Sequence, residues 1–246
     1  MTFSKFGKKF GANAGITSLM DDLGEALSGE SSMIMMGGGN PAHIPEIQQA
    51  FRSRLSEIIE SKADFESLIG TYDPPQGNIS FIRSLKELLN AEFGWDLSTD
   101  NIALTNGSQS AFFMLFNLLA GEFEDGSKKQ IQLPLTPEYI GYSDSGMTEN
   151  FFHSSKPSTF KYHIDFEALE ISDNCGALCV SRPTNPTGNV LTDAEINKLD
   201  KLAKQQGVPL IIDAAYGTPF PNLIFSEATP IWNENIILCL SLSKFG

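Results

Sequence analysis

The chain has 246 residues, of which 41% are hydrophobic, enough to fill the core of one large domain or two small ones. Its 30 acidic and 17 basic residues give a net charge of −13, which repels phosphate backbones and anionic lipids, so we expect neither nucleic acid nor a membrane as a partner. The first residues, MTFSKFGKKFGANAG, lack the apolar core of a signal peptide, and no segment approaches the roughly 20 apolar residues that cross a membrane.

The three cysteines, Cys175, Cys179 and Cys239, lie in or beside apolar runs. No CxxC pair and no histidine at metal-ligand spacing accompanies them. We therefore expect buried free thiols, no metal site and a reducing, cytoplasmic location.

The first half of the chain predicts an arm followed by helices. Residues 1–45 are interpreted as an N-terminal arm and a glycine loop, in which SSMIMMGGGNP is a short strand ending in three glycines. Residues 46–246 are assigned to one large domain. Apolar residues at helical spacing predict helices over 45–59 and 79–93.

NIALTNGSQSAFFMLFNLLAGEF, which follows, is interpreted as a strand, a Gly-Ser turn and a helix. Because that helix is apolar nearly all round, we expect it to lie inside the domain.

Strands and helices alternate in the second half. The strands are expected in QIQLPL, FFHSS, GALCVSRP, VPLIIDAAY and IILCLSLS. Helices are expected near Asp165–Leu169 and from Thr192, where Glu195 completes a capping box. This alternation predicts an α/β fold with a mostly parallel sheet covered by helices on both faces. Ligands bind such sheets at the carboxyl ends of the strands.

Polar, aromatic and ionisable residues follow the predicted strands. Gly107, Ser108 and Gln109 open a helix and could bind an anion such as phosphate, or simply cap the helix. Asp213 could face a cationic nitrogen or cap a turn. Tyr216 could bind a ligand oxygen or fill the core.

Three further groups each have a functional and a purely structural interpretation. Tyr139 could stack on a planar ring or pack in the core. The bond between Asn185 and Pro186 is a candidate cis peptide, although NPTG is also a common turn. Lys244, at the end of a buried strand, is either a reactive amine or a solvated one.

The order SRPTNPTGNV, IIDAAYG and SLSK resembles the fold-type I (class I/II) family of pyridoxal-phosphate aminotransferases. GGGNP resembles the glycine loop of that family, YDPPQGNISFIR its Tyr-Gly-Arg element and TNGSQSA its phosphate loop, so the resemblance covers essentially the whole chain. It implies the large domain of this fold and pyridoxal 5'-phosphate as the cofactor.

The resemblance also implies roles for matching residues. Lys244 would bind the cofactor aldehyde covalently and later move the proton of the substrate α carbon. Asp213 would keep the pyridine nitrogen protonated. Tyr216 and Asn185 would hydrogen-bond the phenolic oxygen, and Tyr139 would stack on the ring.

The remaining implied contacts concern the phosphate and the substrate. Backbone N–H groups around Gly107, with Ser108, Gln109 and Ser241, would hold the phosphate. Tyr72 would reach the cofactor of the neighbouring subunit in a homodimer with shared active sites. Gly39, together with Asn185, would border the substrate carboxylate.

The implied activity is transamination between an apolar amino acid and a 2-oxo acid. Alternatives are a β-lyase, a cyclopropane-forming synthase or another aminotransferase of this fold, and a non-catalytic regulator with the same fold. Such regulators carry a DNA-binding domain ahead of the fold, and no helix-turn-helix or basic face precedes Met33.

Two arginines of the family, one for the phosphate and one for the substrate carboxylate, would lie beyond Gly246. We therefore expect the arm and large domain of a longer enzyme, without its C-terminal small domain. The stretch HSSKPSTFKYHIDF is short for the family, which predicts an omitted loop near Ser155–Phe160.

Overall fold

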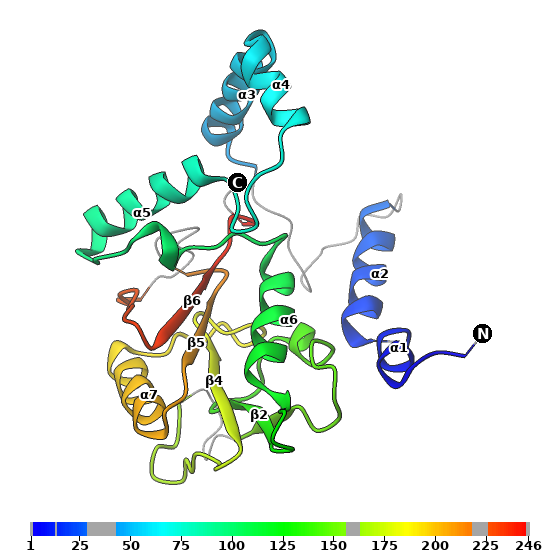
Figure 1. Cartoon of the computed structure of the whole chain (residues 1–246), viewed down its shortest axis with the longest axis vertical. Coiled ribbons are helices and arrows are strands. Elements are labelled where there is room, and N and C mark those ends of the chain that lie inside the picture. The colour runs from blue at the N-terminus through cyan, green and yellow to red at the C-terminus, as the bar shows by residue number, and fades with distance from the viewer. Residues whose placement is uncertain (1, 13, 29–42, 156–162, 218–225, 245–246) are drawn as a thin grey trace. The chain divides into compact units, whose positions relative to one another are not determined.

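The computed structural model describes residues 2–12, 14–28, 43–155, 163–217 and 226–244 (Figure 1). These residues form two compact units. The first unit contains Met1–Asn40 and Gly107–Leu242, and the second contains Pro41–Asn106 and Ser243–Gly246. The boundary predicted between residues 45 and 46 stays a prediction.

The first unit is built on a six-stranded sheet in the order β1-β2-β4-β5-β6, with β3 paired to β2. Only the short β1 is antiparallel to its neighbour, and the other pairs are parallel. The strands are β1 (Gly121–Glu122), β2 (Lys128–Leu133), β3 (Phe152–Ser154), β4 (Cys175–Ser181), β5 (Leu210–Ala214) and β6 (Ile236–Leu240). The predicted parallel α/β sheet is confirmed.

Helices cover both faces of this sheet (Figure 1). On one face, α7 (Asp193–Gln206) packs Ile196, Leu199 and Ala203 into a core with alternate residues of β4 and β5. On the other face, α6 (Ser108–Leu119) packs Phe112 and Phe116 against the remaining residues of the same strands. Because side chains alternate along a strand, each buried strand contributes side chains to the core on both faces of the sheet.

The start of α7 follows from its sequence. Thr192 and Glu195 form the predicted capping box, in which each side chain bonds the backbone of the other residue. Gly207 ends the helix in the left-handed conformation with φ 68°. Also in the first unit are α1 (Lys5–Phe10) and α2 (Gly15–Ser28), and the Lys9 amine donates to the carbonyl oxygen of Gly146 at 2.5 Å.

The regular elements described in the second unit are helices. It contains α3 (Pro45–Glu60), α4 (Lys62–Gly70) and α5 (Ile79–Phe93). The helices predicted over 45–59 and 79–93 are confirmed, whereas α4 was not predicted. The Gln76 amide donates to the carbonyl oxygens of Thr99 and Ile102 at 2.6 and 2.5 Å, which fixes the loop that leads into α5.

Three expectations need correction. Residues 102–105 are extended but form no strand, because the backbone N–H groups of Ile102 and Leu104 donate to Thr99 and Gln76 instead of to a ladder partner. Residues near Asp165–Leu169 form a turn, in which the Asp165 carboxylate accepts the N–H groups of Glu167 and Ala168. The predicted strand in SSMIMM lies outside the described residues.

The third correction concerns α6. Its sequence is apolar nearly all round, yet only one side is buried, with Phe112 and Phe116 at most 1% exposed. Met114 and Leu118 on another side are 58% and 72% exposed. The helix has a single face of the sheet to pack against in this chain, so the expectation of full burial is wrong.

Candidate functional site

Asp213 lies near the carboxyl end of β5, on the face of the sheet that α6 covers. Its register neighbours are Ser181 in β4 and Cys239 in β6. The hydroxyl of Tyr142 donates to Asp213 Oδ2 at 2.6 Å, and the backbone N–H of Ala215 donates to Oδ1 at 3.0 Å. Asp213 is only 6% exposed, so its carboxylate is almost completely shielded from water and lies between two hydrogen-bond donors.

Burial raises the pKa of Asp213 above its ordinary value, while the hydrogen bonds from Tyr142 and Ala215 act in the opposite direction. A cation next to this carboxylate would restore its charged form. The site therefore favours a ligand with a protonated nitrogen.

The aromatic ring of Tyr139 lies next to this acid. Its centroid is 5.5 Å from that of Tyr142, and the two rings are nearly perpendicular at 87°. A side chain at Gly141 would meet a Tyr139 ring carbon at 2.4 Å, so glycine at this position leaves room for the ring. Burial raises the pKa of Tyr139, and electrostatic interactions with Asp213 and Tyr216 add to the shift, so these groups lie within electrostatic reach of one another.

The start of α6 is tied to the same segment. The Gln109 amide donates to the carbonyl oxygen of Gly141 at 2.8 Å and to the Ser145 hydroxyl at 3.3 Å. Gly107 is the N-cap of α6 with φ 82°, a conformation that suits glycine, and no side chain caps the helix there. The structure thus brings Gly107, Ser108 and Gln109 to the segment that carries Tyr139.

Three predicted residues lie in the loops that leave the sheet at its carboxyl edge. Asn185 follows β4, and the peptide bond between Asn185 and Pro186 is cis, which is one of the two alternatives that the sequence left open. Tyr216 follows β5 and Ser241 follows β6. They share one edge of the sheet with Asp213 because the strands are parallel.

Three other predicted residues are not placed at this edge by the structure. Tyr72 and Lys244 belong to the second unit, where Tyr72 is fully exposed. Gly39 lies outside the described residues, as does most of the stretch near Ser155–Phe160. Their participation in the site stays a prediction.

Sequence reasoning missed two residues of this site, Tyr142 and Glu138. Tyr142 donates to Asp213 although 71 residues separate the two. Glu138 directly precedes Tyr139, and its carboxylate accepts the N–H of Ser181 at 3.0 Å. The signal that was available is the sequence PEYIGY, which places an acid and a second tyrosine around Tyr139.

The described residues fit pyridoxal phosphate. A buried carboxylate suits a protonated pyridine nitrogen, and the aromatic side chain of Tyr139, adjacent to it, suits the ring face. The start of α6 supplies backbone N–H groups and a positive helix end that suit a phosphate.

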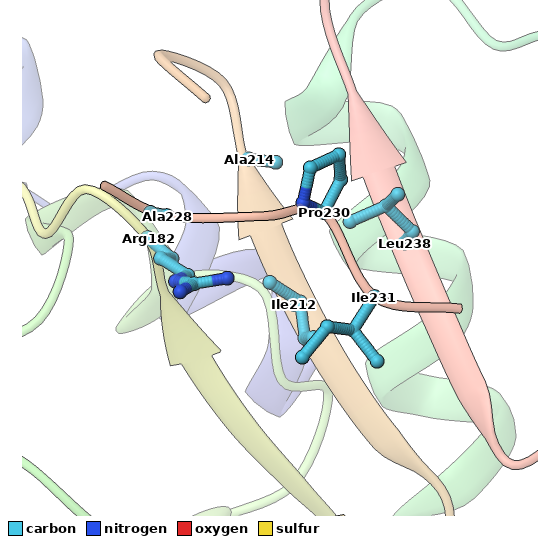
Figure 2. Close-up of a pocket in the computed structure, with 7 residues that line it drawn as sticks. All are labelled: Arg182, Ile212, Ala214, Ala228, Pro230, Ile231 and Leu238. Carbon is cyan, nitrogen blue, oxygen red and sulfur yellow. The ribbon is translucent and has the colours of Figure 1, made fainter. Parts of the chain in front are cut away.

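A small pocket lies elsewhere, on the opposite face of the sheet. Figure 2 shows its lining, which comes from β5 and β6, from the residue after β4 and from the segment before β6: Arg182, Ile212, Ala214, Ala228, Pro230, Ile231 and Leu238. The Arg182 guanidinium donates to the carbonyl oxygens of Leu191 and Thr229 and to Asp193. Because Ile212 and Ala214 alternate with Asp213 along β5, this pocket is separate from the candidate site.

The three cysteines are buried free thiols, as predicted. Within the described ranges, no three His, Cys, Asp or Glu side chains are grouped so that they could hold a metal ion. None of the helices described here is both long and apolar enough to span a bilayer.

A family model for class I and II aminotransferases matches residues 31–245. The valine–pyruvate aminotransferase of Escherichia coli is 54% identical over 253 aligned residues, which cover all of this chain and 60% of that protein. Human tyrosine aminotransferase is 24% identical, with 93% of this chain and 50% of that protein covered.

Solved structures agree with these matches. An aminotransferase structure from Psychrobacter arcticum superimposes with a TM-score of 0.90 at 47% identity and covers 100% of this chain and 62% of that one. The valine–pyruvate aminotransferase of Salmonella typhimurium gives 0.79 at 53% identity, with 94% and 57% covered. The chain therefore spans about 60% of the length of its relatives, such as the E. coli protein.

Proposed function

Since this chain belongs to the class I and II aminotransferase family, which depends on pyridoxal phosphate, we propose that it forms the cofactor-binding part of a valine–pyruvate transaminase. The reaction would convert valine and pyruvate into 3-methyl-2-oxobutanoate and alanine. It would proceed in two half-reactions at one site, the first releasing the 2-oxo acid and the second the new amino acid.

The observation that carries this proposal is the buried Asp213, which accepts the Tyr142 hydroxyl beside the Tyr139 ring. When bound, pyridoxal phosphate supplies an electron sink for the carbanion formed at the substrate α carbon. Asp213 maintains that sink because its negative charge favours a protonated ring nitrogen.

The other predicted residues take the following roles. Tyr139 stacks on the ring, and Tyr216 and Asn185 hydrogen-bond the phenolic oxygen. Lys244 holds the cofactor between turnovers and moves a proton to and from the substrate α carbon.

The phosphate is bound by backbone N–H groups at Gly107 with Ser108, Gln109 and Ser241. The phenol of Tyr72 reaches the phosphate of a partner subunit in a cytoplasmic homodimer. Gly39 and Asn185 border the substrate carboxylate.

The choice of valine and pyruvate is supported by the 54% identity with the E. coli enzyme and the 53% identity with the Salmonella enzyme. Geometry alone does not select them, because one methylene in an apolar pocket changes binding by only about 1–3 kcal/mol.

We also propose that the chain is the arm and large domain of a longer protein, as its 60% coverage of the E. coli protein supports. The intact mass of the purified protein tests this. A mass near 26.9 kDa, that of the present chain, would contradict the proposal.

A product assay on the full-length protein with valine, pyruvate and pyridoxal phosphate tests the activity. Alanine and 3-methyl-2-oxobutanoate should appear in equal amounts, and Lys244→Ala should abolish both the products and the absorbance band of the bound cofactor near 420 nm. Ammonia release in place of alanine would instead favour a β-lyase. Cofactor binding with neither product would favour the non-catalytic regulator.

A further inference from the structure

Glu138 connects the segment after β2 to the end of β4. The backbone N–H of Ser181 donates to Glu138 Oε1 at 3.0 Å, and the Ser181 hydroxyl makes a short hydrogen bond to Oε2. Ser181 is the last residue of β4 and is 2% exposed. The carboxylate is therefore fixed to a buried strand end, and Tyr139, the next residue in the chain, is fixed with it.

Glu138 also lies close to Asp213. Glu138 is bonded to Ser181, and Ser181 and Asp213 are register partners in adjacent parallel strands, so the two carboxylates lie at the same end of the sheet. Burial raises the pKa of Glu138 to about 7, the hydrogen bonds from Ser181 oppose the shift, and the charge of Asp213 adds to it. Keeping both carboxylates charged in a site with little access to water would cost free energy.

The titratable groups near this pair include Tyr139, Tyr142, Cys179 and Cys239. Burial is the largest cause that raises the pKa of each of them, and the negative charge of Asp213 adds to each shift. They are therefore neutral near pH 7. Under the proposed function a protonated ring nitrogen would join the site, and its positive charge would keep Asp213 charged.

We propose that Glu138 is a positioning residue of the cofactor site, which anchors the Tyr139 segment to β4 and whose carboxyl proton controls the negative charge beside Asp213. The inference rests on the proposed function, because the ring that Tyr139 and Asp213 hold is that of pyridoxal phosphate. A charged Glu138 favours the protonated form of any titrating nitrogen on the cofactor. Loss of this charge lowers the pH at which that nitrogen titrates.

The test is a titration of the bound-cofactor absorbance between pH 5 and 9 in the full-length protein. In Glu138→Gln, which keeps the size of the side chain and can still accept the Ser181 N–H through its amide oxygen, we expect the midpoint to fall by about 0.5 pH units or more. The matched control is Glu124→Gln, an exposed acid at the other end of β2, which should titrate like the wild type. A Glu138→Gln curve that coincides with the wild type would overturn the proposal.

Ser181→Ala is the second variant, for the case in which Glu138→Gln does not fold. It removes a hydroxyl that favours the charged form of Glu138, so a smaller downward shift of the midpoint is expected. An unchanged midpoint in this variant would equally overturn the proposal.

The anchoring role is measured as the dissociation constant of pyridoxal phosphate. Glu138→Ala should weaken binding about tenfold, whereas Glu138→Gln should stay within about threefold of the wild type. Equal affinity of Glu138→Ala and wild type would refute the anchoring role. A wild-type protein that binds no pyridoxal phosphate would overturn the proposed function and this inference together, whereas normal binding with unchanged variant titrations would overturn the inference alone.

Discussion

The Tyr142 hydroxyl and the Ala215 backbone N–H favour the charged form of Asp213 and so oppose the effect of burial. Tyr142→Phe removes one of these donors and leaves the ring that packs on Phe112 and Phe116. A hydrogen bond to a charged group contributes about 1.5–3 kcal/mol, so we expect cofactor affinity to fall about tenfold or more.

Absorbance titration of the apo-protein with pyridoxal phosphate measures this effect of Tyr142→Phe. The control is Ser143→Ala, which changes the next residue, whose exposed hydroxyl donates only to the local carbonyl oxygen of Ile140 at 2.9 Å. Wild-type affinity in Tyr142→Phe would show that Tyr142 does not support Asp213.

Glu138 also predicts a pH dependence of stability. Its pKa in the folded state, about 7, is above the ordinary value of 4.5, so the folded protein binds more protons than the unfolded chain between these values. Stability contributed by Glu138 is therefore present below about pH 4.5 and is lost as the pH rises toward 7. The loss is of the order of 3 kcal/mol.

Glutamine does not titrate, so Glu138→Gln should lose less stability than the wild type between pH 5 and pH 8. Urea unfolding of the apo-protein at several pH values gives the difference between the two proteins, and Glu124→Gln corrects for the removal of one acidic charge. Parallel stability profiles for wild type and Glu138→Gln would contradict the assignment of a raised pKa to Glu138.

At the scale of elements, α6 and β4 meet at Gly176. A methyl group on this residue would lie 1.8 Å from the backbone carbonyl oxygen of Leu119, a contact that no side-chain rotation relieves. Gly176→Ala should therefore reduce the free energy of unfolding by about 3 kcal/mol or more.

The matched control for Gly176→Ala is Gly24→Ala in α2, where nothing lies within 4 Å of the added methyl group. Because alanine favours a helix over glycine by about 1 kcal/mol, this control should be neutral or slightly stabilising. Thermal unfolding of both variants measures the difference. Equal melting temperatures would show that α6 does not pack on β4 at this position.

The elements that the sequence predicted correctly are those with a strong local pattern. β4 and β5 are continuous apolar runs, and α7 begins at a capping box. The extended residues 102–105 and the turn near Asp165 were mistaken for regular elements, because ladder partners and Asp side-chain bonds are not visible in a short apolar pattern.

In the candidate site, too, the residues placed by the strand pattern were predicted, and those placed by contacts between distant parts of the chain were not. Asp213 lies near the end of a strand, and Asn185 and Ser241 follow strands, so their position at one edge of the sheet comes from the topology alone. Tyr142 and Glu138 were missed because their partners, Asp213 and Ser181, are 71 and 43 residues away in the chain. Only the fold of the segment after β2 reveals that these side chains meet.

At the scale of the whole molecule, large apolar side chains remain exposed in both units although the net charge is −13. Leu118 of α6 is 72% exposed, and Ile69 of α4 is 69% exposed. Exposed apolar patches promote association, and in the longer protein that we propose, further chain or a partner subunit would cover them.

We therefore expect residues 1–246, produced alone, to self-associate, and the double variant Leu118→Gln with Ile69→Gln to shift the population toward the monomer. Size-exclusion chromatography with light scattering measures this shift. The control is Glu92→Gln, an exposed acid of α5, which should leave the distribution unchanged or more associated because it removes a repelling charge. If the unmodified chain is a monodisperse monomer at high concentration, the exposed Leu118 and Ile69 side chains do not drive association.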